Sequence, residues 1–143
     1  MIRRAAKSDI HGITEIEKVS FSDPWNERLF LDAIDSKDKY LMVADEGGKV
    51  AGYIVFEKVL DEGHITDLAV SGEYKKKGIA TGLIDRALGL AKEKGIKEIF
   101  LEVRESNEAA RKLYSKFGFA ELGKRKGYYQ GTNEDAIILH LYI

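Results

Sequence analysis

Residues 62–104 read EGHITDLAVSGEYKKKGIATGLIDRALGLAKEKGIKEIFLEVR. The two ends, 62–70 and 96–104, are rich in aliphatic and β-branched residues, which favours strands. Between them an apolar stripe at helical spacing is followed by Gly95, a pattern typical of a helix that ends at a glycine. The stripe comprises Ile79, Ala80, Leu83, Ile84, Ala87, Leu88 and Ala91. A strand, a helix and a strand in series predict two parallel strands joined by a right-handed crossover.

The sequence before this unit predicts a strand at 2–5 and then two helices. The first helix begins after Ser8 or Asp9, either of which is a suitable N-cap. Its apolar face comprises Ile10, Ile13, Ile16 and Val19. A second, short helix lies within 22–34, with Pro24 in its first turn and Trp25 exposed in the loop between the helices. The apolar residues of this second helix are Leu29, Phe30, Ala33 and Ile34.

Further strands are predicted on both sides of the central unit. Two β-rich runs flank Gly47-Gly48, and two consecutive glycines suit the tight turn of a hairpin. After the unit, 107–117 reads as a helix ended by Gly118, and the last 24 residues read as two strands joined by a long polar loop. No repeat or linker marks a boundary, so the predicted fold class is a single α/β domain spanning 1–143.

Composition excludes several classes of function. The 143 residues include 23 Lys and Arg against 24 Asp and Glu, so no net positive field is available to hold nucleic acid or an anionic membrane. Cysteine is absent, which excludes disulfides, zinc-thiolate sites and a cysteine nucleophile. No metal site is expected. No apolar run approaches the ~20 residues of a membrane span, and the first residues lack a signal peptide, so we expect a cytoplasmic protein.

The turn EYKKKGIATGLI, 73–84, lies where an open α/β sheet usually binds its ligand, between a strand and the following helix. Unpaired N–H groups at a helix N-terminus can bind phosphate, and Gly78 lets the backbone approach closely. The residues alone leave two interpretations open, a phosphate-binding turn and a solvated charged turn that starts a helix. The Walker pattern and the Rossmann fingerprint are both absent.

Three further segments accompany this turn, namely LEVRESNEAARKLYSKFGF, YYQGTNEDAIIL and FSDPWNE. Together, in this order and spacing, they resemble the GCN5-related N-acetyltransferase (GNAT) superfamily and, within it, the ribosomal-protein alanine N-acetyltransferase (RimI-like) branch. The resemblance implies a mixed, mostly antiparallel sheet with a central parallel strand pair that splays apart, about four helices, and acetyl-CoA as the acetyl donor. Lys75 departs from the Gln or Arg usual in the family, and Ala80 stands where Gly is common.

The resemblance also assigns residues to the cofactor. The backbone of Leu68, Ala69 and Val70 would hold the pantetheine arm, although small apolar residues in a strand are ordinarily core. Asn107 would contact the cofactor, although by position it is also a helix N-cap. The residues of the pyrophosphate turn would be Lys76, Lys77, Gly78, Ile79, Ala80 and Thr81, with Lys75 a weaker candidate.

By the same resemblance, Glu102 is the general base and Tyr114 the general acid. The residue pattern alone makes Glu102 a solvent-facing strand residue and Tyr114 a core aromatic, and His64 is a rival base. The residues expected on the two sides of a peptide groove are Pro24, Trp25, Tyr128 and Tyr129. Glu134 and Asp135 either meet basic residues of a peptide or lie in water.

The acceptor implied by the resemblance is the N-terminal α-amine of a protein, specifically the alanine of a small-subunit ribosomal protein. An α-amine, with a pKa near ~8, is neutral far more often at pH 7 than a lysine amine near ~10.4, so it asks less of the base. Two alternatives remain: acetylation of a small-molecule amine, and a coenzyme A-binding module without enzymatic activity. The partner expected is a protein or peptide N-terminus and not nucleic acid or membrane, with the chain a monomer or weak homodimer.

Overall fold

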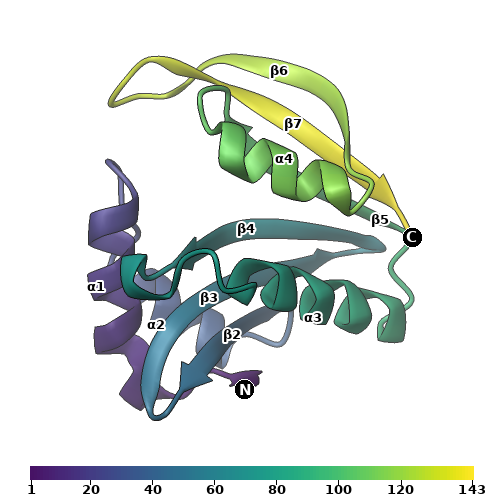
Figure 1. Cartoon of the computed structure of the whole chain (residues 1–143). Helices are drawn as coiled ribbons and strands as arrows, with labels where there is room; N and C mark the ends of the chain where they lie inside the picture. Colours follow the sequence, from purple (N-terminus) through teal and green to yellow (C-terminus); the bar gives the residue numbers. More distant parts are fainter.

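A computed structural model describes all residues, 1–143, and its strands form one seven-stranded sheet in the order β1-β2-β3-β4-β5-β7-β6 (Figure 1). Only β4 and β5 are parallel, and every other neighbouring pair is antiparallel. The strands are β1 (Ile2–Arg4), β2 (Lys39–Glu46), β3 (Lys49–Val59), β4 (Glu62–Val70), β5 (Glu98–Arg104), β6 (Ala120–Tyr129) and β7 (Glu134–Tyr142). The predicted mixed sheet with a central parallel pair is therefore confirmed.

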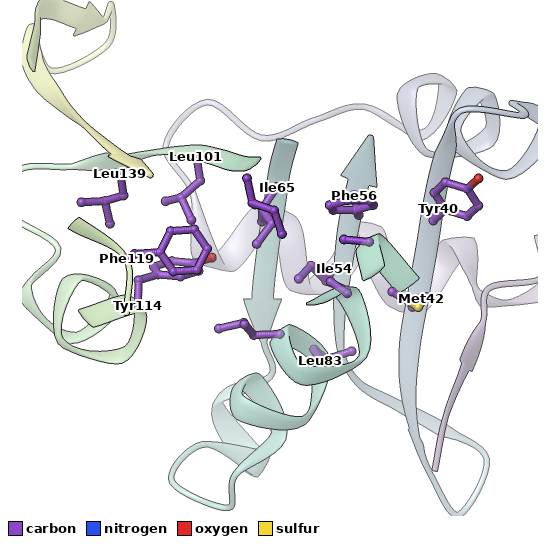
Figure 2. Close-up of a cluster of buried hydrophobic side chains, with 14 of the residues drawn as sticks. Tyr40, Met42, Ile54, Phe56, Ile65, Leu83, Leu101, Tyr114, Phe119 and Leu139 are labelled. Carbon is purple, nitrogen blue, oxygen red and sulfur yellow. The ribbon is translucent and has the colours of Figure 1, made fainter. Parts of the chain in front are cut away.

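Four α-helices cover the two faces of the sheet: α1 (Ile10–Ser20), α2 (Glu27–Asp35), α3 (Ile79–Glu93) and α4 (Glu108–Lys116). Leu83 of α3 and Tyr114 of α4 belong to one apolar cluster, which also contains Ile65 of β4 and Leu101 of β5 (Figure 2). Residues of α1 and α2 pack in a second cluster on the other face, among them Ile13 and Phe30. None of these helices is both long and apolar enough to cross a membrane.

The structure corrects the predicted apolar face of α1. Val19 is 89% exposed, whereas Glu17 is buried with 1% exposure. The prediction stepped by three residues, but the helix repeats every 3.6, so nine residues after Ile10 the face has turned away from the sheet. Asp9 also forms no side-chain cap and instead binds Arg3 with its carboxylate.

Helix α2 starts later than predicted. Pro24 precedes it in the loop, and Asn26 is the N-cap, with its Oδ1 accepting the N–H of Leu29 at 3.0 Å. Leu29 is exposed, contrary to its assignment to the apolar face. Trp25 is half-buried rather than exposed, because its ring packs 5.2 Å from that of Phe30.

The final hairpin is tighter than predicted. Only residues 130–133 separate β6 from β7, so the long polar loop expected there is mostly strand. Tyr128 and Tyr129 accordingly lie at the end of β6 and not in a loop. The hairpin at Gly47 and Gly48 is confirmed, and both glycines have positive φ, as a tight β-turn requires.

Strands β4 and β5 separate halfway along their length. Their pairing runs from Glu62 with Glu98 to Ile65 with Leu101 and then stops (Figure 1). A β-bulge coincides with this point, because Val55 pairs with Asp67 and Phe56 with Ile65, which leaves Thr66 unpaired. The extra residue reverses the side-chain alternation of β4 beyond it.

Candidate active site

A cleft of about 900 Å³ opens where β4 and β5 separate. Its walls come from α1 and the loop after it, both splayed strands, α4, and the hairpin of β6 and β7. The residues predicted for the site that line this cleft are Trp25, Leu68, Glu102, Asn107, Tyr114, Tyr128 and Tyr129. Pro24 and the turn at 76–81 do not line it.

Glu102 faces the cleft from β5, together with Phe100 and Arg104, because alternate strand residues share a face. Its Oε1 lies 3.1 Å from the guanidinium of Arg125, and about a third of the side chain is exposed. The carboxylate is therefore open to the cleft and has a cation beside it. Burial raises the pKa of the Tyr128 phenol, and the nearby negative charge of Glu102 raises it further.

Tyr114 faces the cleft from α4 but is 4% exposed. Its ring packs edge-on against Phe119 at 5.3 Å, and its hydroxyl lies on the side of the ring toward Ile65 (Figure 2). Burial raises the pKa of the phenol well above its usual value, and the charge of Asp67 adds to the effect. Tyr114 is therefore protonated throughout the physiological pH range and available as a proton donor.

The turn before α3 presents a series of free backbone donors. Gly78 is the N-cap with φ of 79°, and Lys76 also has positive φ, at 63°. None of the N–H groups from Lys76 to Thr81 donates to a protein acceptor. A Cβ built at Gly78 would meet no atom within 4 Å, so the space beside the turn is open. These features fit the binding of an anion such as a phosphate.

The backbone of β4 beyond the bulge faces two ways. Ser71 N–H donates to Ala51 O on β3, so by alternation the N–H and C=O of Ala69 also face β3. The same groups of Leu68 and Val70 face the open side. Two of the three residues predicted to hold the pantetheine arm therefore offer hydrogen-bonding groups to a ligand.

Several predicted residues already have partners within the protein. Asn107 Oδ1 accepts the N–H of Ala110 at 3.1 Å, as an N-cap does. Glu134 accepts the N–H of Ser106 at 2.7 Å and lies 3.6 Å from Arg104. Asp135 accepts the N–H of Gly127. The hydrogen bond from Ser106 and the charge of Arg104 lower the pKa of Glu134.

His64, the rival base, also lines the cleft. Its ring stacks on Phe100 at a centroid distance of 5.5 Å, and its Nε2 lies 3.2 Å from Glu62. It stands near the point where the strands begin to separate, one residue before the last parallel pair.

The sequence analysis missed a buried group of polar residues at the cleft. Glu17 accepts hydrogen bonds from the Tyr53 hydroxyl at 2.5 Å and from the Trp25 N–H at 2.9 Å. Asp67 lies beside Glu17 and is 8% exposed. Burial, and then the neighbouring Glu17, raise the pKa of Asp67 to about 9. The available signal was Glu17 itself, a charge four residues after Ile13 on the apolar face of a predicted helix.

Comparison with known proteins identifies the architecture. Residues 10–119 match the model of the Acetyltransferase (GNAT) family. The ribosomal protein bS18-alanine N-acetyltransferase of Escherichia coli (strain K12) is 34% identical over 139 residues, covering 95% of this chain and 93% of the relative. A protein of Bacillus subtilis (strain 168), provisionally assigned the same activity, is 36% identical over 143 residues, covering 99% and 95%.

A solved structure gives the same result. The crystal structure of the ribosomal-protein-S18-alanine N-acetyltransferase from Escherichia coli superposes with a TM-score of 0.91 at 31% identity, covering 100% of this chain and 93% of that one. The splayed parallel strands, the glycine turn before α3 and these full-length similarities agree. The chain belongs to the GNAT family of N-acetyltransferases.

Proposed function

We propose that this chain transfers an acetyl group from acetyl-CoA to the N-terminal α-amine of a protein. The observation that carries the proposal is that Glu102 and Tyr114, on different elements, line one open cleft. The walls of that cleft include Trp25 on one side and Tyr128 and Tyr129 on the other. Aromatic residues of this kind provide rigid contact area with polar edges, which suits the end of a peptide.

Acetyl-CoA would bind to the backbone donors described above. Leu68 and Val70 would pair with the amides of the pantetheine arm, as a sheet edge pairs with a peptide. The N–H groups from Lys76 to Thr81 would bind the pyrophosphate, with Lys76 and Lys77 adding positive charge. When bound, the molecule supplies an activated acetyl thioester and a sulfur leaving group. Ala69 would support this strand from the core, and Asn107 would hold the start of α4 at the cleft.

The two catalytic residues would move protons in opposite directions. Glu102 accepts a proton from the attacking amine, directly or through one water, and its exposure to the cleft gives the amine access. Tyr114 donates its proton to the departing sulfur. A phenol with a raised pKa is a weak acid, so this transfer must accompany bond cleavage rather than precede it. A strand N–H near Val70 would stabilise the negative charge that develops on the acetyl oxygen.

The proposed acceptor is the N-terminal alanine of ribosomal protein bS18. The relatives named for that reaction are 34% identical over nearly their full length, which supports the same acceptor here. Such a substrate places the reaction in the cytoplasm. Acidic side chains also line the cleft, among them Asp23, Glu62 and Glu134, and they would favour a cationic peptide over an acidic one.

The test is a panel of acceptors supplied with acetyl-CoA. Peptides that begin with a free alanine should be acetylated, whereas the same peptides with a blocked N-terminus and an internal lysine should react weakly. Preference for lysine side chains or free polyamines would contradict the proposal. Acetyl-CoA binding without turnover on any amine would indicate a binding module instead.

A tyrosine pair tests the proposed acid. Y114F should lower kcat by about a hundredfold, within the range for loss of a general acid, with the acetyl-CoA affinity unchanged. Y142F is the matched control, because Tyr142 is 74% exposed and lies outside the cleft. Equal activity of Y114F and Y142F would show that Tyr114 is not the general acid.

A further inference from the structure

The Asp67 carboxyl lines the cleft and has no part in the reaction proposed above. It is 92% buried, and its Oδ2 finds no donor in the protein. An ionised carboxylate in this position would therefore carry a buried charge with an unpaired oxygen, which is costly. The surroundings of Asp67 decide whether that charge exists.

Glu17 is the acidic neighbour of Asp67. Its Oε1 accepts a hydrogen bond from the Tyr53 hydroxyl and its Oε2 accepts one from the Trp25 N–H, so both oxygens have donors. Asp67 lies within hydrogen-bonding reach of the same carboxylate. Two adjacent buried carboxyls share one proton, since both cannot ionise without strong repulsion. The proton belongs on Asp67, where it converts one oxygen into a donor to Glu17.

The other groups facing Asp67 do not offset a charge there. They are Asp23 in the loop after α1, Tyr53 on β3 and Tyr114 on α4, one acidic and two neutral. Arg104 is the one Lys or Arg that lines the cleft, and it is paired with Asp23 at 2.9 Å and with Glu134. Asp67 is therefore a neutral carboxylic acid at physiological pH.

The bulge at Thr66 decides which side of the sheet Asp67 faces. Ile65 packs in the cluster on the α3 face, whereas Asp67 lies beside Glu17 of α1, on the opposite face. The turn proposed to bind pyrophosphate begins α3. Asp67 is thus placed on the face away from that turn, next to the Trp25 backbone that forms one wall of the cleft.

We propose that the Asp67 carboxyl, buried beside Glu17 in the wall of the cleft, accepts a hydrogen bond from the acceptor's α-amine and positions that amine for attack. This inference rests on the proposed function. Because Asp67 is already protonated, the proton of the amine goes to Glu102 and not to Asp67. A neutral acceptor also has an advantage over a carboxylate here, since a second negative charge would raise the amine's pKa and keep it protonated.

Two substitutions of Asp67 separate charge from hydrogen bonding. D67N keeps a donor for Glu17 and an oxygen for the amine, so kcat/KM for an alanine peptide should stay within about threefold of wild type at pH 7.5. D67L keeps the approximate volume but neither group, and should lower kcat/KM by about tenfold or more. The loss should appear with the peptide and not in the dissociation constant of acetyl-CoA, measured by calorimetry. That binding measurement also verifies that D67L is folded.

The pH dependence of activity distinguishes binding of the amine by Asp67 from a merely structural role of this residue. Activity of the wild type should fall at alkaline pH as Asp67 ionises, and D67N should lack that fall. E62Q is the matched control, the same type of carboxyl-to-amide change on the same strand at the cleft. It should retain the alkaline fall.

The outcomes that overturn the inference are distinct from those that overturn the function. If the wild type acetylates alanine peptides but D67L does so equally well, or D67N keeps the alkaline fall, Asp67 does not bind the amine. Infrared spectroscopy provides a further check. If the spectrum of D67N kept every protonated-carboxyl band of the wild type, the inference would also be contradicted. If the wild type acetylates no peptide α-amine, the proposed function fails, and the role of Asp67 in it fails too.

Discussion

Glu102 and Asp67 are two carboxyl groups in one cleft, and their surroundings make them chemically different. Glu102 stands at the edge of the separated strands, partly exposed and 3.1 Å from Arg125, so water and a cation stabilise its charge. Asp67 is 8% exposed and faces the buried Glu17, so a charge there would lack both. Burial and neighbours, rather than residue type, suit one carboxyl to accept a proton and the other to retain one.

The largest expected effect comes from removing Glu17, the buried carboxyl beside Asp67. E17A would leave the Tyr53 hydroxyl and the Trp25 N–H without an acceptor and create a cavity. We expect a loss of about 3 kcal/mol in the free energy of unfolding, measured by urea denaturation. E15A is the control, since Glu15 lies on the exposed side of α1 and should change stability little. Similar losses in both variants would remove the distinction between buried and exposed carboxyls.

The second prediction concerns the exposed carboxyl. E102Q should lower kcat by about a hundredfold, the lower range for loss of a general base, while stability changes little because the side chain is partly exposed. Steady-state rates with an alanine peptide measure the effect. E98Q is the matched control, since Glu98 is on the same strand face and outside the cleft. Normal turnover by E102Q would show that Glu102 is not the base and would favour His64 in that role.

The third prediction uses pH to separate the two carboxyls. The pKa of Asp67 is raised in the folded state to about 9 from 3.8, so the folded protein binds more protons than the unfolded chain between these values. Stability contributed by this proton is complete below pH ~4 and declines as pH rises toward ~9, by at most about 1.4 kcal/mol per pH unit. D67N removes the decline, so its melting temperature should exceed that of the wild type increasingly from pH 5 to 8.

Parallel melting curves of E102Q provide the contrast for that experiment. The difference between E102Q and wild type should be small over this pH range, because the side chain is partly exposed and its ion pair contributes little to stability. If the difference between D67N and wild type did not grow with pH, Asp67 would be ionised in the folded protein, and the comparison between the two carboxyls would no longer hold.

The smallest effect is expected from the ion pair at the cleft edge. R125A removes the cation beside Glu102, and a partly exposed pair contributes less than about 1 kcal/mol to stability. Urea denaturation at low salt measures this loss in the free energy of unfolding. High salt should reduce the difference between R125A and wild type, because salt screens the pair. Equal stability of R125A and wild type at low salt would show that the pair contributes nothing to folding.

Local sequence patterns were sufficient for most of the fold. The apolar stripe of α3 depends on residues within one or two helical turns, and the apolar alternation of β5 depends on residues within one or two pleats. The structure has both elements close to where they were predicted. The pattern failed at element ends. Val19 was placed on the buried face by a three-residue step, and Pro24 was assigned to a helix whose cap is Asn26. The first error arises because the α-helix repeats every 3.6 residues, and the second because a helix boundary depends on a single capping contact.

The candidate site was predicted by another route. Glu102 and Tyr114 were assigned through their resemblance to a known family, and both line one cleft in the structure. Asp67 carried no such signal, and the charge of Glu17 on a predicted apolar face did not by itself indicate a partner 50 residues further along the chain. Their relationship depends on the packing of α1 against the sheet and on the bulge at Thr66.

Periodicity, turn chemistry and composition, which involve neighbours in the chain, were therefore enough to predict an α/β fold with a central parallel strand pair, a glycine turn before the long helix and the absence of cysteine chemistry. The protonation of Asp67 was not accessible in this way. It depends on desolvation and on charges that folding brings together from distant positions, and both are properties of the packed molecule.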